Sequence, residues 1–168
     1  MSDLDLARAL PWITRHVVGF QSPATARKFE GGQSNPTFML QAASGEYVLR
    51  RKPAGQLLKS AHAVEREFRV QRALARSEVP VANMLALCED SAVIGSTFYV
   101  MDHVKGRSFD DPRIPELSQA ERRAIYIEMN RVLAAIHSVD IEAVGLGDFG
   151  PRGNYYRRQI DRWSKQYR

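Results

Sequence analysis

The sequence predicts an α+β fold, in which an antiparallel sheet of about five strands and a helix precede a helical region. Between residues 29 and 104, short runs rich in strand-forming residues alternate with turns and are interrupted by one helical pattern. After residue 106, apolar residues recur at helical spacing only. The composition, with 44% hydrophobic and 26% charged residues in 168 positions, is that of an ordinary globular protein.

Before residue 60 we expect one helix followed by strands. Gly45-Glu46 is typical of a hairpin turn between two strands. The expected elements are a helix over 4–18 that is interrupted or restarted at Pro11-Trp12, a linker over 21–26, strands at Phe29 and over 37–42, and a strand over 46–51.

After residue 60 the pattern changes from mixed to helical. Ser60 is suited to cap a helix over 60–76 that carries apolar residues on one side. Ser118, with Glu121 three residues later, matches a capping box at the start of a second helix. The other expected elements are strands over 84–89 and 97–104, and the two late helices are expected over 118–139 and 155–167.

A turn of small residues separates the first two strands. ATP phosphates need backbone N–H donors that can be approached closely, and glycine and small polar residues permit that approach. The candidate phosphate-binding residues here are Gly31, Gly32, Ser34, Asn35 and Thr37. The turn is neither a G-x-G-x-x-G loop nor a Walker A motif, so an ordinary hairpin turn rich in turn-forming residues stays open as the alternative.

A cation and a carboxylate follow the turn at a suggestive spacing. Arg50 ends the third strand, and Glu67 lies on the apolar side of the next helix. Because Glu67 has no lysine or arginine three or four residues away, we expect it to take a cation from elsewhere. Glu65 has Arg69 at i+4 and is expected to form a surface pair with it. The alternative is that Arg50 and Glu67 are unrelated solvated charges.

The last predicted strand runs into a short polar segment with a glycine. This pattern fits a hinge between two lobes, where backbone groups would pair with adenine while the phosphates reach the turn. The candidate residues are Met101, Asp102, His103 and Val104. An ordinary strand that ends in a turn is the alternative.

Several classes of protein are disfavoured. The N-terminus lacks a basic segment followed by an apolar core, and no apolar run is long enough to span a bilayer, so we expect neither a signal peptide nor a membrane partner. The only cysteine, Cys88, excludes an internal disulfide or a multi-cysteine zinc site and is expected in the core of a cytoplasmic protein. The net charge of +5 arises within 152–168, at the chain end, so we expect no nucleic-acid partner.

The motifs together resemble the aminoglycoside phosphotransferase and choline kinase-like family, and in particular the phosphotransferase-like domain that some proteins carry fused to an acyl-CoA dehydrogenase. The resemblance covers residues 25–168. The segments that carry it are 30–38 (EGGQSNPTF), 47–53 (YVLRRKP), 65–70 (EREFRV), 98–101 (FYVM) and 133–140 (LAAIHSVD).

The resemblance implies a protein-kinase-like, ATP-binding N-lobe over 1–101, a hinge over 102–106, and over 107–168 the first helices of a C-lobe truncated before its catalytic loop. It implies ATP and Mg²⁺ as cofactors and transfer of the γ-phosphoryl group to a hydroxyl of a small molecule. It also implies that Arg50 stands where the family has a lysine, and that Glu67 orients it. Arginine and lysine are not interchangeable around phosphate, so this departure matters.

The family's catalytic H-x-D loop has no counterpart in this sequence. None of the four histidines is followed by Asp at the second position after it. Asp148-Phe149-Gly150 resembles a D-F-G metal motif, but it follows Asp140 too closely to leave room for a catalytic loop and its strands. We therefore expect no catalytic residue and no metal ligand in this chain, and an inactive fragment of a phosphotransferase.

The alternative function is a non-catalytic module that binds a nucleotide or another protein. The late helices over 118–139 and 155–167 carry apolar stripes that little else in the chain could cover. We therefore expect the chain to form a homodimer or to bind a partner that supplies the missing lobe. The sequence does not identify the acceptor substrate.

Overall fold

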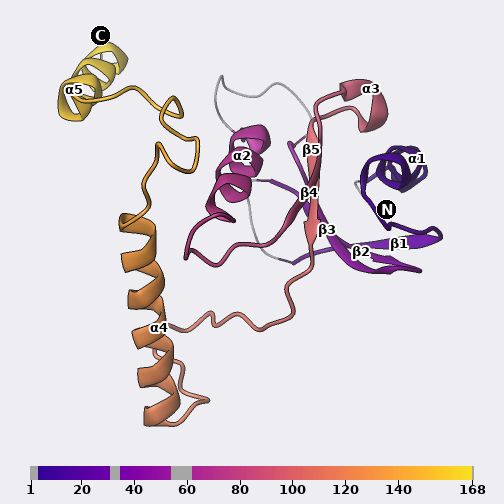
Figure 1. Cartoon of the computed structure of the whole chain (residues 1–168), viewed down its shortest axis with the longest axis horizontal. Helices are drawn as coiled ribbons and strands as arrows, with labels where there is room; N and C mark the ends of the chain where they lie inside the picture. Colours follow the sequence, from indigo (N-terminus) through magenta and orange to yellow (C-terminus); the bar gives the residue numbers. More distant parts are fainter. Residues whose placement is uncertain (1–3, 31–34, 54–61, 168) are drawn as a thin grey trace.

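The fold is built around one antiparallel sheet (Figure 1). The computed structural model describes residues 4–30, 35–53 and 62–167. Five strands lie in the order β1-β2-β3-β5-β4. Their bounds are β1 Ala24–Lys28, β2 Thr37–Ala42, β3 Gly45–Arg51, β4 Met84–Cys88 and β5 Phe98–Asp102. The expected α+β class, with a five-stranded sheet and added helices, is confirmed.

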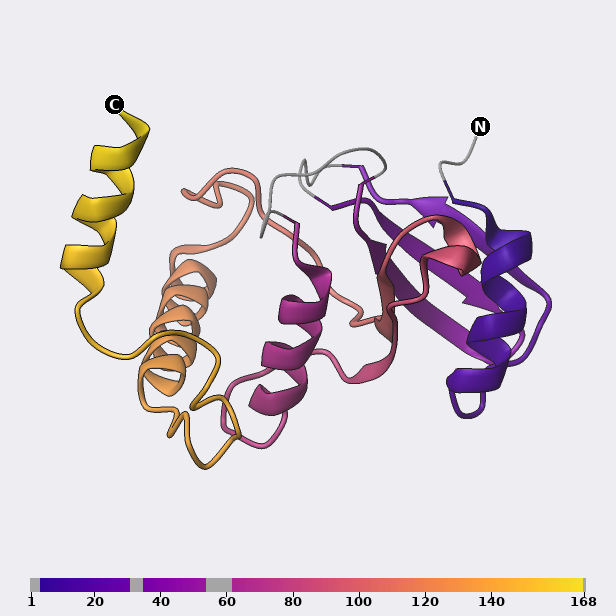
Figure 2. The ribbon, with the colours of Figure 1, turned by 90° about the horizontal axis from the view of Figure 1, so that it is seen from above.

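Two helices cover opposite faces of this sheet (Figure 2). Successive side chains of a strand point to opposite faces, and β5 shows this alternation. Phe98 and Val100 join the core formed with α1, Leu6–His16, whereas Tyr99 packs with Val64 and Phe68 of α2, Val64–Leu74. The α2 face of the sheet is the face that carries the candidate site.

The first helix runs through Pro11 without interruption, so the expected break there is wrong. Asp5 caps the helix by accepting a hydrogen bond from the Arg8 N–H at 3.2 Å. Ala9 and Ile13 lie on one side of the helix and are fully buried in the sheet core. Burial of this apolar side offsets the one backbone hydrogen bond that a proline removes.

Two further boundaries differ from the sequence prediction. The expected linker over 21–26 contains the start of β1, because Ala24 pairs with Ala42 across the sheet. The second helix begins at Val64 with Ala63 at its N-cap, and the expected cap Ser60 lies outside the described residues.

One short helix, α3 (Ser91–Ile94), was not predicted. Asp90 accepts a hydrogen bond from the Ala92 N–H at 2.8 Å, and Gly95 ends the helix in the left-handed region. An aspartate cap and a closing glycine are the recognised signals of a helix, but with so few residues between them no apolar period is visible.

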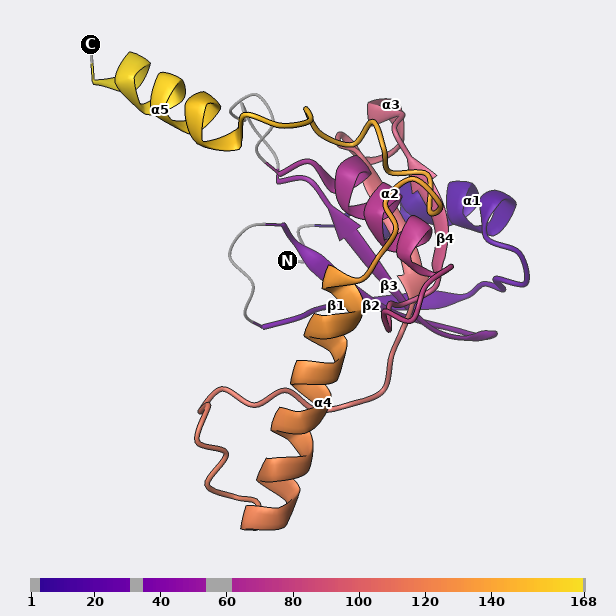
Figure 3. The ribbon, with the colours of Figure 1, turned by 60° about the vertical axis from the view of Figure 1, so that its left-hand side comes forward.

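The two late helices extend away from the sheet (Figure 3). They are α4, Gln119–His137, and α5, Tyr155–Gln166. The predicted capping box is present, since Ser118 and Glu121 each bond to the other's backbone N–H. Neither helix contains a buried residue. Within the described ranges, no helix combines the length and the apolar character that a membrane crossing requires.

Candidate functional site

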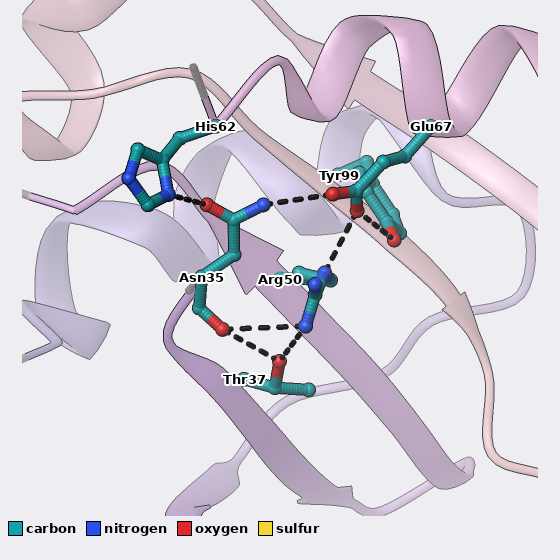
Figure 4. Close-up of polar contacts among 6 residues, drawn as sticks. All are labelled: Asn35, Thr37, Arg50, His62, Glu67 and Tyr99. Carbon is teal, nitrogen blue, oxygen red and sulfur yellow. Dashed lines mark hydrogen bonds and ion pairs between the residues drawn. The ribbon is translucent and has the colours of Figure 1, made fainter. Parts of the chain in front are cut away.

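The site is centred on an ion pair between β3 and α2 (Figure 4). Arg50 Nε donates to Glu67 Oε2 at 2.8 Å. Arg50 lies opposite Tyr99 in the sheet register, and Tyr99 packs on the α2 face. The side chain of Arg50 therefore leaves the sheet toward α2, where Glu67 lies one position before the buried Phe68. The cation that the sequence analysis required for Glu67 is Arg50.

Glu67 is held by two more donors. Asn35 Nδ2 donates to Glu67 Oε1 at 2.8 Å, and the Tyr99 hydroxyl donates to Oε2 at 3.2 Å. Both carboxylate oxygens thus have partners, and each partner comes from a different segment of the chain. A carboxylate held in this way is fixed in position and in turn fixes Arg50.

Arg50 also holds the end of the small-residue turn. Its Nη1 donates to Thr37 Oγ1 at 2.8 Å and to the Asn35 backbone carbonyl at 3.3 Å. The Thr37 hydroxyl donates to the same carbonyl at 3.1 Å. One guanidinium therefore joins the turn, the sheet and α2.

Asn35 is 3% exposed, and its side chain lies between two segments. Its Oδ1 is 3.0 Å from Nδ1 of His62, which precedes α2 and has a positive φ of 58°. A positive φ is uncommon for a residue other than glycine. The side-chain amide of Asn35 thus connects His62 with Glu67. The predicted contact of Asn35 with phosphate stays a prediction.

Tyr99 contributes a neutral phenol to this cluster. Burial disfavours the tyrosinate, and the nearby Glu67 carboxylate adds to that effect, so the pKa of Tyr99 rises to about 12. The hydroxyl therefore remains a hydrogen-bond donor over the whole physiological range. Sequence reasoning missed Tyr99 and His62. Strand alternation from Phe98 could have placed Tyr99 on the α2 face, whereas no signal in the sequence identified His62.

A cleft of about 570 Å³ opens beside the ion pair. Among the predicted site residues, Thr37, Arg50, Glu67 and Met101 line it. The other lining residues come from α2, β5 and the chain before α5: Arg66, Val70, Gln71, Tyr99 and Phe149. The structure thus brings together residues from the turn, the cation strand, the acidic helix and the last strand.

The structure gives no evidence on nucleotide binding for the remaining predicted site residues. His103 Nδ1 lies 2.9 Å from Glu46 Oε2, and the Asp102 N–H donates to the Asn83 carbonyl at 3.0 Å. Val104 is exposed. The prediction that these hinge residues face adenine stays a prediction. Gly31, Gly32 and Ser34 lie outside the described residues.

The expected helix pair between Glu65 and Arg69 is not formed. Lys52 Nζ lies 2.8 Å from Glu65 Oε2, and Arg69 pairs with Asp148 instead. Partial burial by itself would raise the pKa of Glu65, but its hydrogen bond and ion pair with Lys52 outweigh this effect and keep the pKa below its ordinary value. Helix spacing missed both partners, because each of them lies far away in the sequence.

Comparison with known proteins gives consistent results. The profile of the phosphotransferase enzyme family matches residues 25–168. A crystal structure from Ralstonia eutropha JMP134, of a protein assigned to the aminoglycoside phosphotransferases, superposes with a TM-score of 0.82 at 52% identity, over 98% of this chain and 47% of that one.

The sequence relatives include much longer proteins. Mouse acyl-CoA dehydrogenase family member 10 is 51% identical over 87% of this chain and 14% of its own length. Mouse acyl-CoA dehydrogenase family member 11 is 46% identical over 97% of this chain and 21% of its own length. The chain thus spans 14% and 21% of the length of these two relatives, and less than half of the superposed structure.

Proposed function

The chain belongs to the phosphotransferase enzyme family, and on that basis we propose that it is the nucleotide-binding part of an ATP-dependent kinase that phosphorylates a hydroxyl of a small molecule. Membership of the family supports a kinase-type enzyme. The use of ATP and the small-molecule acceptor belong to the proposal.

The single observation that carries it is the Arg50–Glu67 ion pair at the edge of the cleft. Phosphoryl transfer depends on positioning and on neutralising the charge of the phosphates. A guanidinium has five N–H donors, and the contacts to Glu67, Thr37 and Asn35 occupy only some of them. Arg50 can therefore bind a phosphate oxygen while Glu67 keeps it in place.

The nucleotide fits this site as follows. The triphosphate lies in the cleft against Arg50 and Thr37. Gly31, Gly32, Ser34 and Asn35 stay predicted phosphate contacts, and the first three lie outside the described residues. The adenine reaches the segment from Met101 to Val104 at the end of β5. An arginine at this position binds oxygen pairs in a fork, whereas a lysine acts as a point charge.

Mg²⁺ accompanies ATP in such enzymes and helps to neutralise the phosphate charge. Within the described ranges, no three His, Cys, Asp or Glu side chains cluster to hold a metal ion. Both oxygens of Glu67 are already bound by Asn35, Arg50 and Tyr99. Mg²⁺ therefore stays a prediction, to which the described residues assign no ligand.

We propose that this chain binds the nucleotide without transferring a phosphoryl group by itself. The sequence contains no H-x-D motif to orient the acceptor hydroxyl. Asp148, which resembles the metal-binding Asp of a D-F-G motif, is paired with Arg69. The second candidate function is therefore that of a non-catalytic module that binds a nucleotide at this site.

We further propose that the outer helices receive the rest of a helical lobe. A broad groove of about 880 Å³ runs along α4 and is lined by apolar side chains such as Met129, Leu133 and Ile136. The superposed Ralstonia structure contains more chain than this sequence covers, which supports polypeptide of that kind as the occupant. Analytical ultracentrifugation tests this: a monomer supports the proposal, and a discrete dimer that Met129→Asp dissociates would favour a second copy of this chain.

Calorimetric titration with MgATP tests the nucleotide site. We expect saturable binding to the chain and at least about tenfold weaker binding to Arg50→Ala, because the variant loses a charge-assisted phosphate contact. Arg15→Ala, which removes a cation at an exposed position of α1 on the opposite face of the sheet, is the matched control and should bind like the unmodified chain. Equal affinities of the unmodified chain and Arg50→Ala would reject the proposed site.

A further inference from the structure

A short segment between α4 and α5 contacts α2 through hydrogen bonds, an ion pair and a cation–π interaction. This latch segment, residues 144–149, buries Val144 and Leu146, although α4 before it and α5 after it have no buried residue. Figures 1 and 2 show the chain between α4 and α5 running beside α2. The segment is therefore the point at which the helical region is fastened to the sheet lobe.

Two arginines of α2 make the attachment. Arg66 Nη2 donates to the Phe149 carbonyl at 3.0 Å, and its guanidinium lies 3.9 Å from the centroid of the Phe149 ring. Arg69 Nη2 forms an ion pair with Asp148 and donates to the Gly145 carbonyl at 3.3 Å. The contacts thus combine a cation–π stack, an ion pair and two hydrogen bonds to backbone carbonyls.

These contacts lie next to the site. Arg66 and Arg69 flank Glu67 in the sequence of α2, and Arg66 and Phe149 line the same cleft as Arg50 and Glu67. A rotation or shift of α2 would therefore move Glu67 and release Arg50. The end of α2 that carries Glu67 has no side-chain cap at Ala63 to fix it.

We propose that the latch segment positions α2, and through Glu67 sets Arg50 for nucleotide phosphate. Arg66, Arg69, Asp148 and Phe149 are then positioning residues, which act through α2. This inference rests on the proposed function, since it assigns a role to the same cleft.

The charges support this reading. The hydrogen bond and the charge of Arg69 hold the pKa of Asp148 below its ordinary value, so the pair stays ionised down to acidic pH. The side chains of Arg69 and Asp148 are 45% and 77% exposed, and an ion pair of this kind contributes little to stability alone. The cation–π contact with Phe149 and the two hydrogen bonds to carbonyls therefore contribute most to holding the latch segment against α2.

The test compares paired variants of the whole 168-residue chain. Asp148→Asn with Phe149→Leu removes the ion pair and the aromatic face while it keeps similar bulk. Asp148→Glu with Phe149→Tyr keeps both interactions and is the conservative rescue. Glu128→Gln is the matched control, because it breaks an exposed ion pair with Arg131 on α4.

Two measurements are made on each variant. Hydrogen exchange of the α2 backbone amides, without nucleotide, reports whether the latch segment holds the helix. Calorimetric titration with MgATP and with adenosine reports whether the helix sets Arg50 for phosphate. We expect the disruptive pair to speed exchange in α2 and to weaken MgATP binding by about three- to tenfold, with adenosine binding unchanged. The conservative pair and Glu128→Gln should resemble the unmodified chain.

Three results would overturn parts of this account. Unchanged exchange in α2 would reject the latch. Faster exchange with unchanged MgATP affinity would reject its positioning role and leave a structural contact only. Failure of the unmodified chain to bind MgATP would reject the proposed function, while α2 exchange would still decide whether residues 144–149 hold the helix. Asp148→Asn alone changes an exposed side chain and gives the same comparison if the double variant does not fold.

Discussion

In the sheet lobe, the described part of residues 4–106, helices α1 and α2 bury apolar side chains against opposite faces of one sheet, whereas α4 and α5 in the helical region have no buried residue. The difference does not arise from the local stability of the helices, since α4 has a complete capping box. It lies in what each element packs against. The sheet lobe therefore has a hydrophobic core of its own, whereas large apolar side chains of the outer helices, such as Leu133 and Trp163, are exposed.

The largest expected effect on stability comes from comparing a Leu→Ala substitution in the sheet lobe with one in α4. Leu49→Ala, at a fully buried position, should lower the free energy of unfolding by about 3 kcal/mol, because it leaves a cavity in the core. Leu133→Ala, at a position that is 51% exposed, should change it by less than about 0.5 kcal/mol. Urea denaturation followed by circular dichroism measures both. Equal losses would show that α4 is packed as tightly as the sheet.

The next largest effect is a difference in stability loss between substitutions of two nearby carboxylates of α2, Glu67 and Glu65. Glu67→Ala should lower the free energy of unfolding by about 2 kcal/mol, because Arg50, Asn35 and Tyr99 all lose an acceptor. Glu65→Ala removes only the pair with Lys52 and should cost less than about 1 kcal/mol. Denaturation of the two variants side by side decides this, and a larger loss for Glu65→Ala would contradict the central place of Glu67.

A pH effect should distinguish a tyrosine of the sheet from one of the outer helices. The pKa of Tyr99 is raised from 10.0 to about 12 by burial and by Glu67, so the folded state holds the proton more tightly than the unfolded state. The resulting stability is fully present below pH 10 and is lost as the pH rises through about 12.

The measurement is the free energy of unfolding as a function of pH for the unmodified chain and for Tyr99→Phe. The variant should lack the part of the decline that falls between pH 10 and about 12. Tyr156→Phe, at a position 82% exposed in α5, should leave the profile as it was. Parallel profiles for the unmodified chain and Tyr99→Phe would refute the assignment.

The smallest effect concerns the cap of α4. Ser118→Ala removes the side-chain acceptor of the capping box and should weaken the first turn of α4 by about 1 kcal/mol. The unfolding of the sheet lobe should hardly change, because α4 buries nothing in it. Hydrogen exchange resolves the two regions, and a matching loss of protection in the strands would show that they unfold together.

The sequence allowed most of the fold to be predicted where local signals and packing agree. The strands β2 to β5 and both late helices were expected within a few residues, and so was the capping box at Ser118. The break at Pro11 was wrong because burial of Ala9 and Ile13 overrides a local preference. The short α3 could not be found by periodicity, because it is little longer than one helical turn.

At the site, the sequence predicted a need for charge but not the full set of contacts. Glu67 lacked a partner on its own helix, and this pointed to Arg50. The roles of His62 and Asn35 depend on two segments that meet only in the folded chain. Arg69 has a carboxylate at helix spacing, yet it binds Asp148, 79 positions away in the sequence. Contacts of this kind depend on tertiary structure and leave no local pattern.

The central claim is that Arg50, held by Glu67, binds the phosphates of a nucleotide. The most direct test is the ratio of the MgATP and AMP affinities, measured by calorimetry for the unmodified chain and for Arg50→Gln. We predict that the unmodified chain prefers MgATP by at least about tenfold and that the variant loses most of this preference while it still binds AMP. An unchanged ratio in Arg50→Gln, or no binding of either nucleotide to the unmodified chain, would contradict the claim.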